Sequence, residues 1–499
     1  MIFNSLTFII FLLFVVILYW FLPRNPRIWL LVISSIIFYG FWDYRFIPLL
    51  FLSIIIDYFA AIYMEIGRSS KKRTRIMIAA ILSNLIILSI FKYLIFFMQQ
   101  AVGLTQFFTG TTEPAGFSLP FHIILPLGIS FYTFQSMSYT IDVWRGHIKA
   151  EREFKLFTAY VIFFPQLVAG PILRAGEVIW QLDKRPNFVW NNLGEGLNRI
   201  IIGLFLKVFL ADNLAKLVNT GFAIAPSQLG GIDILTLAFL FGFQIYFDFA
   251  GYSQIAIGCA KIMGIKFPEN FNFPYLAHNP REFWKKWHIS LSSWIRDYLY
   301  LPLFKENIEQ NSLNGIEIKL KRTRISTTRG ILALWITWMI MGFWHGANWT
   351  FVLWGIWHAV LITLYRFLEK TIKIKIWAPL SWGLTLILVM IGWIPFRALN
   401  LSHSFDLFER LLNLNTWLKP DHLGGQFPFW LGLHRDSYYA AAGILLAMIL
   451  IWSLKEYVFP KYNKYPIIFY ITQIVLFLVL LPIVYLFLRQ TSQFIYFQF

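Results

Sequence analysis

The chain has 499 residues, of which 58% are hydrophobic, 19% aromatic and only 14% charged, with a mean hydropathy of +0.62. Soluble proteins carry about 25% charged residues, so the composition excludes a water-soluble globular protein and predicts a polytopic membrane protein. The net charge is +18, from 43 Lys and Arg against 25 Asp and Glu. In a membrane protein the excess basic residues are expected in the cytoplasmic loops, so the charge does not require a nucleic-acid partner and none is expected.

Apolar runs alternate with charged turns in the N-terminal part. The run at 6–22 has no basic region before it and no small-residue cleavage site, so it predicts a span and not a cleavable signal. Arg24 and Arg27 follow it, which places the N-terminus outside the cytoplasm. Five basic residues predict a cytoplasmic turn at 68–75, whereas 98–122 contains no Lys or Arg and is expected outside. Further spans are predicted at 28–44, 46–66, 76–97 and 121–142, before the basic segment 145–155.

The next apolar stretch, 157–173, is interrupted. Pro165, Gly170 and Pro171 break a helix, so we expect a re-entrant segment. Irregular backbone at membrane depth must be shielded by protein or line a cavity. Long spans follow at 196–222 and 232–264.

The C-terminal half begins with another basic loop, 317–329, which is expected in the cytoplasm. Apolar stretches follow at 330–345, 348–367, 377–396, 437–454 and 466–488. The loop 397–436 and the tail 489–499 are both expected outside, since three lysines precede the last span. The predicted fold is all-α, with ten or eleven transmembrane helices plus re-entrant and amphipathic helices.

Residues 281–300 are too polar to span a membrane, but their pattern predicts one amphipathic helix. At 100° per residue, the apolar residues within an arc of about 100° are Trp284, Trp287, Leu291, Trp294, Ile295 and Tyr298. His288 lies in the apolar half of this helix. The pattern suits a helix on the membrane surface or over a bundle. It leaves open whether His288 is an interfacial residue or part of a functional site.

A second candidate histidine is His345, in the tryptophan-rich stretch 335–358. Gly342 and Gly346 have GxxxG spacing around it and permit close approach by another helix or a ligand. Burial disfavours the imidazolium cation, and a neutral imidazole is the form that a general base needs. A hydrogen-bonded packing histidine fits the same pattern equally well. We interpret His358, in a similar setting, as structural.

The sequence contains no motif for nucleotide binding, serine-hydrolase chemistry or metal-dependent catalysis. There is no P-loop, GxGxxG, HExxH or GxSxG motif, and no metal is expected. Asp248 is an intramembrane carboxylate that we interpret as a helix-packing polar group. The single cysteine, Cys259, excludes an intramolecular disulfide framework and a multi-cysteine metal site, and is read as a packing residue.

Around these histidines and Asp248, the chain resembles the membrane-bound O-acyltransferase (MBOAT) superfamily, in the bacterial branch of alginate and peptidoglycan O-acetyltransferases. The resemblance runs through nearly the whole chain. Three motifs carry it: PLGISFYTFQSMSYTIDVWRG (126–146), FFPQLVAGPI (163–172) and FDFAGYSQIAIG (247–258). The most specific parts are FPENFNFPYLAHNPREFWKKWHISLSSWIRDYLYLPL (267–303) and MGFWHGANWTFVLWGIWHA (341–359).

The resemblance places the family's catalytic histidine at His345 and its second functional histidine at His288. It implies a single integral membrane domain over 1–499, with N-terminal spans in 1–145, the catalytic core in 146–368 and C-terminal spans in 369–499. It also implies acetyl transfer from cytoplasmic acetyl-CoA to an exported polysaccharide, with no permanently bound cofactor. The expected location is the bacterial cytoplasmic (inner) membrane, with both termini extracytoplasmic. The expected partners are the lipid bilayer and an extracytoplasmic serine-dependent acetyltransferase.

The tail 494–499 contains one hydroxyl, that of Tyr496. Because a phenol has a pKa near 10, below that of alcohols, its ester would pass an acetyl group onward readily. The tail resembles a short C-terminal FxYxxF-like motif associated with the family, so Tyr496 is predicted as an acyl relay. An aromatic anchor for the last span is the alternative.

Two other functions remain open at this point. One is D-alanyl transfer to teichoic acid from a phosphopantetheine carrier protein, in the same superfamily. The other is a lipid or glycan transporter, which would also need broken helices and buried polar groups.

Overall fold

The computed structural model describes residues 1–67, 69–109, 124–184, 186–304, 327–371, 377–417, 432–453 and 466–488. These residues form helices and connecting segments, with no strand among them, which confirms the predicted all-α fold. The backbone forms two compact units. The first unit comprises Met1–Asn213, Ile245–Glu269 and Tyr465–Phe499, and the second comprises Leu214–Gln244 and Asn270–Lys464.

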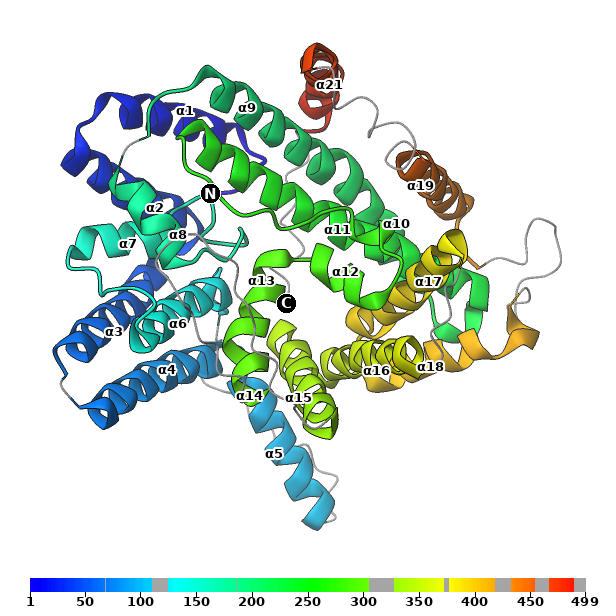
Figure 1. Ribbon diagram of the computed structural model, residues 1–499. Helices are drawn as coiled ribbons and strands as arrows, with labels where there is room; N and C mark the ends of the chain where they lie inside the picture. The colour runs from blue at the N-terminus through cyan, green and yellow to red at the C-terminus, as the bar shows by residue number, and fades with distance from the viewer. Residues whose placement is uncertain are drawn as a thin grey trace. The chain divides into compact units, whose positions relative to one another are not determined.

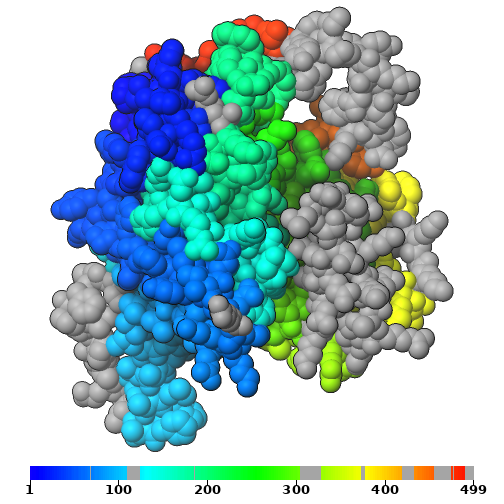
Figure 2. Space-filling model, turned by 60° about the vertical axis from the view of Figure 1, so that its left-hand side comes forward, coloured from blue at the N-terminus to red at the C-terminus, as the bar shows by residue number. Residues whose placement is uncertain are grey.

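The first unit is built mainly from the N-terminal helices (Figure 1). They are α1 (Leu6–Phe21), α2 (Arg24–Asp43), η1 (Tyr44–Phe46), α3 (Ile47–Ile66), α4 (Ser70–Lys92), α5 (Leu94–Thr109), α6 (Ile129–Arg145), α7 (Phe154–Ile162), α8 (Ala175–Asp183), α9 (Trp190–Leu204), the π-helix η2 (Phe205–Ala211) and the C-terminal α21 (Pro466–Phe487). Helices α3, α4 and α6 pack together, and Figures 1 and 2 both show α5 extending away from them. Helix α5 occupies part of the predicted outer segment 98–122. Among the residues that the structure describes in α5, only Phe96 is buried.

The predicted re-entrant stretch is irregular and enclosed by protein. After α7, residues 163–174 form turns and extended backbone, and all of them up to Leu173 are buried. Gly128, which begins α6 with φ of 71°, lies against this segment: a Cβ there would be 2.4 Å from the Leu167 carbonyl oxygen. The expected shielding of irregular backbone is therefore confirmed.

The second unit contains the candidate histidines. Its elements are η3 (Pro226–Gln228), η4 (Pro274–Leu276), α12 (Pro280–Lys286), α13 (Ile289–Ile295), the π-helix η5 (Arg296–Tyr300), α14 (Leu301–Phe304), α15 (Thr327–His345), α16 (Trp349–Thr371), α17 (Ala378–Arg397), α18 (Leu401–Leu412), η6 (Leu414–Thr416) and α19 (Arg435–Ser453). Two helices continue from one unit into the other, α10 (Asp212–Phe222) and α11 (Gly231–Ile262). Helix α18 lies in the predicted outer loop 397–436, and the Asn400 side chain caps it by accepting from the His403 amide at 2.8 Å.

Six helical segments of the described chain are long and apolar enough to cross a membrane. They are Arg24–Ile66, Ser70–Lys92, Gly231–Ile262, Trp349–Thr371, Ala378–Arg397 and Arg435–Ser453. Shorter apolar helices lie at Leu6–Phe21 and Phe477–Phe487. These segments confirm a polytopic membrane protein, while the count of ten or eleven spans stays a prediction.

Candidate active site

Two glycines bring helices α15 and α16 into backbone contact (Figure 1). A Cβ at Gly342 would lie 2.3 Å from the Phe351 carbonyl oxygen, and one at Gly355 would lie 2.3 Å from the Trp338 carbonyl oxygen. Gly346 has no room for a Cβ either, since the Phe351 ring would be 2.1 Å away. The predicted close approach at the GxxxG motif is therefore a helix–helix contact.

His345 is the last residue of α15, and only 6% of its surface is exposed. Aromatic rings of the described chain contact the imidazole, among them Trp344 at 4.8 Å, Trp354 at 5.0 Å and Phe396 at 5.3 Å between ring centroids. The Trp354 plane is nearly perpendicular to the imidazole, at 85°. These rings cover most of the imidazole surface. Its role as catalytic base stays a prediction.

His358 is fully buried one helix turn beyond Trp354. Its Nδ1 accepts a hydrogen bond from the indole N–H of Trp284 at 3.3 Å, and its ring lies 5.0 Å from Trp354. Trp354 therefore contacts both His345 and His358. The interpretation of His358 as a packing residue fits these contacts, but sequence reasoning missed its bond to α12.

His288 interrupts the helix predicted over 281–300. Its backbone is left-handed, with φ of 42° and ψ of 59°, so α12 ends before it and α13 begins after it. The prediction of one continuous helix over 281–300 was therefore wrong, because a residue in this conformation cannot continue a right-handed helix. The predicted apolar face was right: Trp284, Trp287, Leu291, Trp294, Ile295 and Tyr298 are all buried.

The His288 imidazole is also buried, and it stacks against Phe271 at 6.4 Å between centroids. The segment before α12 fixes the loop: the Asn270 carbonyl accepts from the Ile289 amide at 2.9 Å, and its side chain accepts from Ser290 Oγ at 2.9 Å. Burial lowers the pKa of His288 to about 3, so the imidazole is neutral at ordinary pH.

The two candidate histidines belong to one aromatic cluster. Phe271, which stacks on His288, lies 5.2 Å from Trp287, and Trp287 lies 5.2 Å from Trp393 of α17. Trp393 lies 6.1 Å from Trp354 beside His345. The structure thus brings the junction between α12 and α13 together with α15, α16 and α17 around tryptophan rings. Tyr496, the third predicted site residue, lies outside the described residues.

Asp248 has charged partners that sequence analysis did not find. In the first unit, Lys207 Nζ lies 2.7 Å from Asp248 Oδ1 and 2.9 Å from Asp212 Oδ1, and all three side chains are buried. Lys207 lies in the π-helix η2. Asp248 is therefore part of an ion-pair cluster and not a single packing polar group. No group of His, Cys, Asp or Glu able to hold a metal ion occurs among the described residues.

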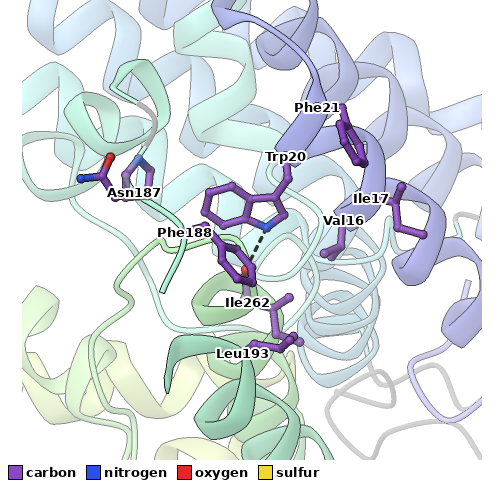
Figure 3. A pocket seen from close by; sticks show the side chains of 9 residues that line it. Val16, Ile17, Trp20, Phe21, Asn187, Phe188, Leu193 and Ile262 are labelled. Atoms are coloured by element: carbon purple, nitrogen blue, oxygen red, sulfur yellow. Dashed lines mark hydrogen bonds between the residues drawn. The ribbon is translucent and has the colours of Figure 1, made fainter. Parts of the chain in front are cut away.

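A pocket of about 430 Å³ lies in the first unit and contains neither candidate histidine (Figure 3). Trp20 and Phe188 form much of its wall, and the Trp20 indole donates to the Ile262 carbonyl at 3.3 Å. Asn187 contributes a polar side chain to an otherwise apolar lining.

Comparison with known proteins identifies the family. Residues 147–314, which include His288, match the membrane-bound O-acyltransferase family. The chain is 38% identical over 419 residues to the probable alginate O-acetylase of Pseudomonas aeruginosa, covering 84% of this chain and 76% of that protein. It is 33% identical over 424 residues to the peptidoglycan O-acetyltransferase of Helicobacter pylori, covering 79% and 75%.

A shorter similarity extends to the teichoic acid D-alanyltransferase of Bacillus subtilis, with 30% identity over 281 residues, 54% of this chain and 67% of that protein. All three relatives are named for transfer of an acyl group. This chain is an acyltransferase that belongs to the membrane-bound O-acyltransferase family.

Proposed function

We propose that this enzyme takes acetyl from cytoplasmic acetyl-CoA and passes it across the bacterial inner membrane for O-acetylation of an exported polysaccharide. The observation that carries the proposal is the position of His345, a buried imidazole at the end of α15 within an aromatic cage. The similarity to proteins named for acetylation of alginate and peptidoglycan supports acetyl as the group and a polysaccharide as the final acceptor.

His345 acts as the general base. Its neutral imidazole takes the proton from an acceptor hydroxyl as that oxygen attacks the thioester carbonyl carbon of acetyl-CoA. The new C–O bond forms, the C–S bond breaks, and the CoA thiolate takes the proton from the imidazolium. General-base catalysis of this kind contributes about 10²–10⁴-fold in rate. The enclosing rings exclude water, which would otherwise hydrolyse the thioester.

His288 positions the acceptor, and Tyr496 serves as the relay. His288 belongs to the same aromatic cluster as His345, which supports a shared role. Acetylated Tyr496 would carry the group to an extracytoplasmic serine-dependent acetyltransferase partner. In Tyr496→Phe cells, polymer acetylation should be lost while the protein still inserts. Full acetylation would reduce the tail to an aromatic anchor.

D-alanyl transfer is the second candidate, favoured by the similarity to the Bacillus subtilis enzyme. It differs in the donor, a charged carrier protein in place of acetyl-CoA. The greater coverage of relatives named for acetylation favours the acetyl group. Membership of an acyltransferase family argues against transport alone.

The donor distinguishes these candidates. Purified enzyme in lipid nanodiscs is given labelled acetyl-CoA or a carrier protein loaded with labelled D-alanine, with a soluble hydroxyl acceptor, and label transfer is measured. Transfer from acetyl-CoA that is lost in His345→Ala supports the proposal. Transfer from the carrier protein alone would overturn it in favour of D-alanylation.

A further inference from the structure

A row of three polar side chains runs along one buried face of α16. Thr350, Trp354 and His358 follow one another at intervals of four residues and are 1%, 1% and 0% exposed. At 100° and 1.5 Å per residue, they fall within an arc of about 80° and extend over about 12 Å of the helix. The middle residue of this polar row, Trp354, contacts His345.

Each member of the polar row has a buried atom without a hydrogen-bond partner among the described residues. These atoms are Thr350 Oγ1, Trp354 Nε1 and His358 Nε2. Nδ1 of His358 accepts from Trp284, so its proton lies on Nε2, and that nitrogen is a donor. Buried polar groups in folded proteins nearly always have a partner. Three such atoms on one helix face could donate hydrogen bonds to an oxygen-bearing ligand along α16.

Trp354 has a ring in contact with the proposed catalytic base His345. Its ring lies 5.0 Å from the His345 ring, and it is held by His358 at 5.0 Å, Phe396 at 5.3 Å and Trp284 at 5.6 Å. These contacts fix the ring, so its N–H needs no reorganisation during a reaction. An indole N–H is a donor only and does not titrate in the working range. It matches an oxygen that becomes negatively charged.

We propose that the indole N–H of Trp354 is the oxyanion donor for acyl transfer at His345, an inference that rests on the proposed function. When the acceptor oxygen attacks the thioester carbon, the carbonyl π electrons move onto oxygen. Trp354 Nε1 donates a hydrogen bond to that oxyanion. The C=O bond re-forms as the C–S bond breaks, and the thiolate takes the proton held by His345. In a water-excluded site, a preorganised donor of this kind is worth far more than in water.

Trp354→Phe removes the N–H and keeps an aromatic ring. We expect kcat for transfer from acetyl-CoA to fall about 10²-fold, the usual effect of deleting one oxyanion donor, while KM for acetyl-CoA stays within about threefold. Trp357→Phe is the matched control on the same helix, because the Trp357 indole N–H already donates to the Leu388 carbonyl at 2.9 Å. It should retain wild-type kcat.

Benzothienylalanine at position 354, introduced by codon suppression, separates the hydrogen bond from packing. It keeps the shape of the bicyclic ring and replaces N–H by sulfur, so it should be as slow as Trp354→Phe. Wild-type kcat in this variant would overturn the proposal. If His345→Ala is inactive while both Trp354 variants are fully active, the oxyanion assignment fails and the proposed function stands. Full activity in His345→Ala overturns the proposed function and, with it, the oxyanion assignment.

Discussion

The indole N–H of Trp284 donates to Nδ1 of His358 across 3.3 Å, in the buried interior of the second unit. This bond joins α12, which leads into His288, to α16, which carries Trp354. The two rings also meet edge to face, with centroids 4.9 Å apart and planes at 88°. This contact thus links the segment that leads into His288 to the helix whose Trp354 ring contacts His345.

Trp284→Phe should weaken the fold by leaving His358 Nδ1 buried without its donor. An unsatisfied buried group costs about 1–3 kcal/mol, so the thermal unfolding midpoint in detergent should fall. Trp29→Phe is the control, because the Trp29 side chain is 50% exposed. Equal midpoints for Trp284→Phe and the wild type would show that the bond contributes nothing.

Gly355→Ala should prevent α15 and α16 from packing. The added Cβ would lie 2.3 Å from the Trp338 carbonyl oxygen, a backbone atom that cannot rotate away. Overpacking of this kind costs about 1–3 kcal/mol or more, so the yield of monodisperse protein and the transfer rate should both fall. Gly383→Ala, in α17, is the matched control, since nothing lies within 4 Å of the added Cβ. A wild-type yield for Gly355→Ala would contradict the observed packing.

Lys207→Met should destabilise the first unit by about 3–5 kcal/mol, because it leaves Asp248 and Asp212 as buried carboxylates without their cation. The triple variant with Asp248→Asn and Asp212→Asn removes those charges and should recover much of the loss. Thermal unfolding of purified protein measures both. If the triple variant is no more stable than Lys207→Met, neutralisation of the two carboxylates by Lys207 does not contribute to the stability of the first unit.

Substitutions at His288 can separate its backbone from its imidazole. Asn adopts the left-handed conformation more readily than most residues, whereas Val does not. His288→Asn should therefore fold and bind acetyl-CoA but transfer acetyl poorly, and His288→Val should accumulate poorly. Size-exclusion profiles, acetyl-CoA binding and transfer rates distinguish the two effects. Normal transfer by His288→Asn would show that the imidazole has no role.

Hydropathy predicted much of this fold because long apolar helices leave a local signal. The spans expected at 28–44, 46–66 and 377–396 correspond closely to α2, α3 and α17. The turn at His288 leaves no such signal. A periodicity of 100° per residue identifies which residues are buried, but the predicted residues are buried on both sides of the break, so the pattern does not reveal the break itself. Helix α18 was missed, although Asn400 followed by buried Ser404, Leu407 and Leu411 is a typical capped amphipathic pattern.

Residues distant in sequence were harder to predict. Lys207 and Asp248 are 41 positions apart, so no local spacing pairs them. The polar row on α16 follows a regular four-residue interval, but only burial shows that Trp354 and His358 have polar atoms without partners in the described chain. His345 was identified from its glycine spacing and family resemblance, and the structure adds the rings around it.

The most direct test of acyl transfer at His345 is the rate of acetyl transfer from acetyl-CoA by purified His345→Gln protein. Gln keeps a polar side chain of similar reach and cannot act as a base, so we expect the rate to fall by at least about 10²-fold. The size-exclusion profile and unfolding midpoint should match those of the wild type. A correctly folded His345→Gln enzyme that transfers acetyl at a near-normal rate would contradict the account.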